Sequence, residues 1–140
     1  MTSTPTLTSA RHPWRRTRWL LVLLGVLLPY AAQLDNGNGL QVYTDSGWAG
    51  NLFLWGMGAV LWLPLLALTW LYRYPASIWW PAVMGLGFAF WLHLSVDFSA
   101  DAQAGLAVVL IPLISLAPLA VGALIGWGMD VRARSKAAVQ

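Results

Sequence analysis

Two ionisable residues at helical spacing are the strongest candidates for chemistry in this chain. His93 lies in an apolar stretch and Asp97 follows it four residues later, so both fall on one face of a predicted helix. An ionisable side chain within a membrane span indicates a functional site. The pair, together with Asn51, predicts a proton-handling or ligand site near one membrane surface. The simpler interpretation, which we favour, is a neutral His93 hydrogen-bonded to Asp97 or to a neighbouring helix.

A haem ligand is the other chemistry that His93 suggests. A b-type haem usually takes two axial ligands, and the sequence pairs no second intramembrane His or Met with His93. We therefore expect no cofactor. The chain has no cysteine and no glutamate, so disulfides, thiolate ligands and Glu-based acid–base pairs are excluded. No nucleophile with a base, phosphate-binding glycine loop or metal cluster is visible, and we expect no enzyme and no metal.

The composition indicates an integral membrane protein. Hydrophobic residues make up 59% of the 140 residues and charged residues only 9%. A soluble domain carries roughly 25% charged residues, because its surface must be solvated. The net charge of +3 does not indicate nucleic-acid binding, since the basic residues lie in tails and one short loop beside apolar runs.

The apolar runs predict an all-α, four-transmembrane-helix bundle. We expect helices over about 14–34, 48–72, 77–97 and 102–128, each long enough to cross a bilayer. Residues 1–13 are expected to form a disordered cytoplasmic tail and 131–140 a second cytoplasmic tail. Ser77 is the expected cap of the third helix, and Asp130 is expected in water after the fourth. The first run resembles a signal peptide, but it lacks a small-x-small cleavage site, and we interpret it as an uncleaved span.

The distribution of charge predicts the orientation. With four spans, all 8 basic residues fall on one side, and Asp35, Asp45, Asp97 and Asp101 fall on the other. Basic residues beside spans stay in the cytoplasm during insertion. We therefore expect a multi-pass protein of a bacterial inner membrane with both termini cytoplasmic.

Two residue patterns indicate helix packing. Gly122 and Gly126 form a small-residue ridge on the fourth helix, and Gly85 and Ala89 form one on the third. The ridge of Gly122 and Gly126 is interpreted first as packing inside the bundle and second as a dimer or partner face, and that of Gly85 and Ala89 as a small face turned inward. Trp48, Trp55 and Trp62 recur every seven residues on the second helix. This aromatic stripe is interpreted as a packed or lipid-facing seam, with a pigment or partner helix as the alternative.

The segment that begins Asp101-Ala-Gln-Ala-Gly-Leu resembles an element of small, uncharacterised bacterial inner-membrane proteins with four helices. The resemblance covers the last quarter of the chain and implies the four-helix fold without a function. Small multidrug exporters have a similar length, but they depend on a Glu in the first helix, which this chain lacks.

These observations favour a non-enzymatic membrane protein that acts through intramembrane helix contacts. It would be an accessory subunit of a membrane complex or an immunity-type protein against a membrane-acting toxin, with lipid and a membrane-protein partner or a second copy as its contacts. The first alternative is a homo-oligomeric transporter or channel with His93, Asp97 and Asn51 in an outer vestibule. The second is a haem- or quinone-associated subunit that uses His93.

Overall fold

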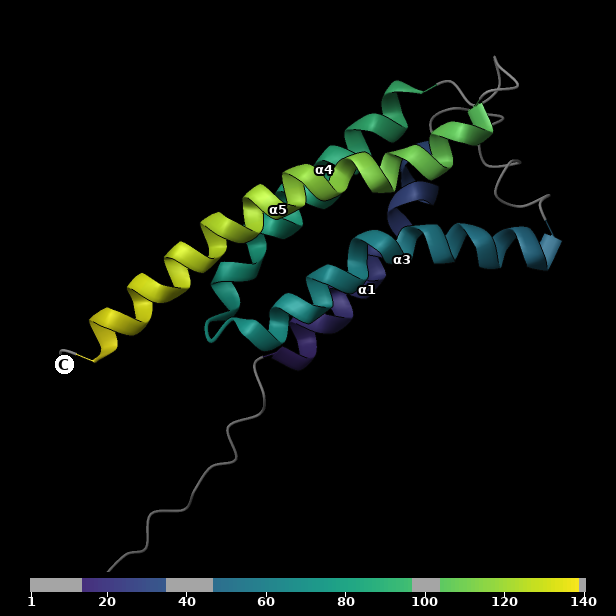
Figure 1. The fold of residues 1–140 in the computed structure, drawn as a ribbon. Helices are drawn as coiled ribbons and strands as arrows, with labels where there is room; N and C mark the ends of the chain where they lie inside the picture. The colour runs from purple at the N-terminus through teal and green to yellow at the C-terminus, as the bar shows by residue number, and fades with distance from the viewer. Residues whose placement is uncertain (1–13, 35–46, 97–103, 139–140) are drawn as a thin grey trace, which may run out of the picture.

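The chain folds into four α-helices in the part that the structure, a computed structural model, describes (Figure 1). Residues 14–34, 47–96 and 104–138 are described. The helices are α1 (Trp14–Gln33), α3 (Gly47–Leu71), α4 (Trp79–Ser95) and α5 (Ala104–Ala137), and a 3₁₀ turn, η1 (Pro75–Ile78), precedes α4. All regular structure in these ranges is helical, which confirms the predicted all-α class.

Three of the helical segments are long and apolar enough to cross a membrane. They are Gly47–Leu71, Pro75–Ser95 and Leu106–Ala137. A helix satisfies its own backbone hydrogen bonds, so it is one of the two structures that a hydrocarbon layer accepts. The protein is therefore a helical membrane protein. Helix α1 is not among the three segments; it carries Arg15, Arg16 and Arg18 in its first turns.

The helices pack as two antiparallel pairs, α1 with α3 and α4 with α5 (Figure 1). Pairing of α4 with α5 is the most extensive contact in the fold. Leu21 of α1, Leu65 of α3, Leu86 of α4 and Ile111 of α5 meet in one apolar core. The core is small, because most large apolar side chains face outward, as expected when lipid surrounds the bundle.

Glycines set the close approach of α4 to α5. A Cβ atom on Gly85 would lie 2.8 Å from the Leu119 Cβ, and one on Gly122 would lie 2.7 Å from the Pro81 Cα. A Cβ atom on Gly126 would collide with the backbone oxygen of Ser77. These contacts follow one another turn by turn along the pair, so the small residues fix its register. Ala89, the last small residue of the α4 ridge, is buried.

The helix bounds differ from the sequence-based ones at two places. Helix α5 continues to Ala137, whereas a helix end near residue 128, followed by a cytoplasmic tail over 131–140, was expected. An i, i+4 ion pair between Asp130 and Arg134 supports these extra turns. Ser77 does not cap α4: it lies inside η1, its backbone N–H donates to the Tyr74 oxygen, and α4 begins without a side-chain cap.

Candidate functional site

A cavity lies where all four helices meet, in the half of the bundle away from the 72–75 connection. Its volume is about 30 Å³, and His93 lies in its wall. The His93 side chain is buried. The polar and glycine positions of the wall come from different helices: Gly25 and Tyr30 from α1, Trp55 and Gly58 from α3, and His93 from α4.

A backbone contact orients the His93 ring. The Nδ1 atom lies 2.8 Å from the Ala89 backbone oxygen, one turn earlier on α4. A carbonyl oxygen only accepts, so Nδ1 carries a proton and donates it to the Ala89 oxygen.

Two of the stripe tryptophans bind α3 to α1 beside this cavity. Trp55 donates its indole N–H to the Tyr30 hydroxyl oxygen at 3.0 Å. Trp62 covers Gly25, where an added Cβ atom would lie 2.7 Å from the Trp62 Cβ. Trp48, the third member, is 79% exposed. The stripe is thus an α1–α3 seam along part of its length and an outward-facing surface at its start.

The structure brings together only part of the site expected at His93. Asn51 is half-buried on α3 and does not belong to the cavity wall, while Asp97 lies outside the described residues. Tyr30 lies in the cavity wall and is a residue that sequence reasoning did not include in the site. The only signal was a Tyr beside Pro29 in an otherwise apolar run.

The cavity fits water better than a cofactor. A volume of about 30 Å³ holds one or two water molecules, whereas small-molecule pockets measure roughly 300–1,000 Å³. A haem does not fit there without separation of the helices. Within the described ranges, no three His, Cys, Asp or Glu residues come together as a metal site.

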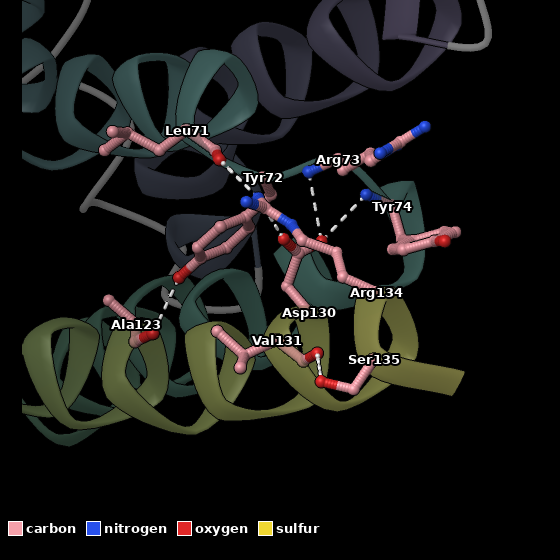
Figure 2. A network of polar contacts seen from close by, with 9 residues as sticks. All are labelled: Leu71, Tyr72, Arg73, Tyr74, Ala123, Asp130, Val131, Arg134 and Ser135. Carbon is pink, nitrogen blue, oxygen red and sulfur yellow. Dashed lines mark hydrogen bonds and ion pairs between the residues drawn. The ribbon is translucent and has the colours of Figure 1, made fainter. Parts of the chain in front are cut away.

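A second polar cluster lies at the opposite end of the bundle, around Asp130 (Figure 2). The Asp130 side chain is fully buried. Its Oδ1 atom accepts the backbone N–H groups of Arg73 at 3.0 Å and Tyr74 at 2.8 Å, and its Oδ2 atom pairs with the Arg134 guanidinium. Arg134 also donates to the Leu71 backbone oxygen at 3.1 Å.

Asp130 therefore holds the connection between α3 and η1 against α5, although the sequence predicted it in water. A carboxylate is retained in a buried place when amides and a guanidinium satisfy both of its oxygens. The four-residue spacing of Asp130 and Arg134 fits the ion pair, a signal that the sequence analysis did not use, whereas no local pattern marks the two amides.

Tyr72 extends the Asp130 cluster into the α4–α5 pair. Its hydroxyl donates to the Ala123 backbone oxygen at 2.7 Å, and its ring covers Gly126. Burial, and then the negative charge of Asp130, raise the pKa of Tyr72. The hydroxyl consequently stays protonated and remains a donor.

Helix α1 is attached at this same end. The Arg18 Nε–H donates to the Thr69 hydroxyl at 2.9 Å, and the guanidinium carbon lies 5.3 Å from the centre of a Trp70 ring. Thr69 in turn donates to the Leu66 backbone oxygen at 2.6 Å. The start of α1, the 72–75 connection and the end of α5 thus share one end of the bundle, which also carries every basic residue in the described ranges.

Comparison with models of protein families, with curated proteins and with solved structures found no match to this chain.

Proposed function

We propose that the chain is a four-span protein of a bacterial inner membrane that acts, without catalysis, through intramembrane contact with another membrane protein. In this topology α1 is the fourth span and both termini are cytoplasmic. Two findings support it. Helix α1 packs along α3 and α4, and all described basic residues gather at one end of the bundle, as cytoplasmic retention of basic residues requires.

Among the three segments that are long and apolar enough to cross a membrane, α3 is the least covered, and it carries the proposal of a protein partner. Only 17% of the apolar window of α3 is buried within the chain, compared with 44% for the Pro75–Ser95 segment and 33% for α5. The first turns of α3 expose large side chains: Trp48, Leu52, Phe53 and Trp55. Aromatic side chains supply large contact areas at low entropy cost, and they are enriched where proteins bind one another. The start of α3 is therefore the proposed partner surface.

Site-specific photo-crosslinking in the host membrane tests this surface. A photoreactive amino acid replaces Leu52 on α3 or, as a matched control, Ile114 on α5; the two side chains are 53% and 52% exposed. We expect position 52, and not position 114, to give one adduct with a membrane protein that mass spectrometry identifies. The same protein should co-purify with the wild-type chain in mild detergent and be lost with Leu52→Lys.

The identity of the adduct decides between the two roles. An enzyme or transport complex in the adduct supports an accessory subunit, and a membrane-acting toxin supports an immunity protein. Adducts with lipid alone, with a second copy alone, or equally from positions 52 and 114 would overturn the proposal.

Labelling of single cysteines tests the topology separately, and the chain has no native cysteine to interfere. A membrane-impermeant maleimide should label Asn38→Cys in intact spheroplasts and Ser135→Cys only after lysis. Labelling of both positions in intact spheroplasts would contradict the four-span arrangement.

The cavity supports one further candidate, a small homo-oligomeric transporter or channel that uses His93. The observation in its favour is the convergence of His93, Tyr30 and Trp55 on a space of water size. Proton flux into liposomes should then fall with His93→Ala and be unaffected by Asn51→Ala, which lies outside the wall. Unchanged flux with His93→Ala would remove this candidate. A quinone- or haem-associated subunit, the remaining alternative, requires a Soret band or a bound quinone that His93→Ala abolishes.

A further inference from the structure

An apolar groove runs between α1 and α4 on the outer surface of the bundle. Its volume is about 380 Å³, far larger than the cavity at His93. Every residue in its wall is aliphatic, aromatic or glycine, and the wall includes Leu24, Leu27 and Ala31 of α1 and Trp79, Val83 and Gly87 of α4. Leu24, Leu27 and Val83 are about half exposed or more. The groove is therefore open to the surrounding hydrocarbon.

The face of α1 that forms the groove ends in a cation. Arg16, Leu20, Leu24, Leu27 and Ala31 are separated by steps of four, four, three and four residues, so they follow one face of the helix. Arg16 and Leu20 are exposed. Arg16 stands eight residues before Leu24, about 12 Å along the axis at 1.5 Å per residue.

An aromatic residue flanks the groove at the same end. Trp79 is the first residue of α4, directly after η1, and it contributes to the wall. Both α1 and α4 begin at the basic end of the bundle, because Arg18 of α1 contacts the end of α3 there. Trp residues prefer the headgroup level of a bilayer. One end of the groove thus has a cation and an interfacial Trp, and the remainder is apolar.

We propose that this groove binds one anionic phospholipid. Its negatively charged headgroup pairs with the Arg16 guanidinium, and an acyl chain lies between α1 and α4 over Leu24 and Leu27. One leaflet of hydrocarbon is about 15 Å thick, which matches the rise from Arg16 to this part of the groove. A charge at one end and an apolar remainder complement an amphiphile.

This inference rests on the part of the proposed function that places α1 in the bilayer. It does not depend on a protein partner, since the proposed partner surface lies on α3. If the cysteine labelling agrees with four spans but no lipid binds, the lipid-binding proposal alone is overturned. If the labelling contradicts four spans, the proposed topology is overturned.

Native mass spectrometry of the full chain in mild detergent tests the groove, with phosphatidylglycerol and phosphatidylcholine as probes. We expect one retained phosphatidylglycerol per chain. Arg16→Gln should lower its apparent affinity about fivefold, the usual effect of one basic residue near an anionic surface. Arg15→Gln is the matched control: it removes the same charge from the neighbouring position, about 100° around the helix, and should change affinity less than twofold.

A second variant blocks the groove itself. A Cβ atom on Gly87 meets no other atom within 4 Å, so Gly87→Leu places its side chain in open space. It should abolish retention of the lipid while circular dichroism shows unchanged helix content. Equal retention of both lipids, or equal losses with Arg15→Gln and Arg16→Gln, would overturn the proposal. A chain dimer that Gly87→Leu disrupts and Arg16→Gln does not would assign the groove to a second copy and overturn it as well.

Discussion

The polar side chains at the two ends of the bundle have different surroundings. At the basic end, Asp130 binds two backbone amides and a guanidinium, and Arg18 binds Thr69 and lies over Trp70. At the other end, His93 borders a cavity of about 30 Å³, and α3 turns exposed aromatic side chains outward. Satisfied polar groups and close packing stabilise a fold, whereas cavities and uncovered surfaces remain available for ligands or partners. The comparison places the satisfied polar contacts at the basic end, and the cavity at His93 together with the proposed partner surface of α3 at the other.

Asp130→Ala should have the largest effect on stability. It leaves the backbone N–H groups of Arg73 and Tyr74 without their acceptor and removes the ion pair of Arg134, and each hydrogen-bond donor left unsatisfied costs about 1–3 kcal/mol. The free energy of unfolding, measured by SDS titration in mixed micelles, reports the loss. Arg132→Ala removes an exposed charge two residues away on the same helix and should change little. Equal effects of the two variants would contradict the role given to Asp130.

Gly122→Ala should have the second-largest effect on stability. The new Cβ atom would lie 2.7 Å from the Pro81 Cα, and a backbone atom cannot move without separation of α4 from α5. Overpacking of this kind costs about 1–3 kcal/mol. Gly128→Ala is the control, because no atom lies within 4 Å of a Cβ there. If both variants are equally stable in the same titration, the α4–α5 register is not set by Gly122.

Arg18→Gln should cost about 1 kcal/mol, since it removes a cation–π contact and weakens the bond to the Thr69 hydroxyl. Thr69 keeps its bond to the Leu66 oxygen, which limits the loss. Arg15→Gln, on an exposed side chain, is the comparison, and both are measured by thermal unfolding in detergent. A loss no larger than that of Arg15→Gln would show that Arg18 does not hold α1 to α3.

Tyr30→Phe should have the smallest effect on stability, about 0.6 kcal/mol, the average for a hydrogen bond between membrane helices. The variant should nevertheless change the surroundings of Trp55 beside the cavity. The indole N–H signal of Trp55 in an NMR spectrum should shift, because its acceptor at 3.0 Å is lost, while that of Trp70 should not. A stability loss as large as that of Asp130→Ala would contradict the claim that the basic end contributes more to stability than the end at His93.

Sequence reasoning predicted the helices well and the polar contacts poorly. The all-helical membrane class and most helix bounds followed from the length of the apolar runs, which the bilayer dictates. It was wrong about Asp130, expected in water, and about the end of α5. The error at Asp130 has a physical cause: its burial depends on the backbone amides of Arg73 and Tyr74, which lie more than fifty positions away in the sequence.

His93 gives the same lesson at the other end. Its spacing marked it as the ionisable residue of its helix, yet the companions that the structure gives it are Tyr30 and Trp55 in the cavity wall, not Asn51. The sequence by itself determined the lipid surroundings of the protein, its helices and the one-sided distribution of its basic residues, because these depend on the composition of contiguous runs. Only the tertiary structure decided which polar groups meet, because helix rotation and register depend on close contacts such as those of Gly85 and Gly122, which join distant segments of the chain.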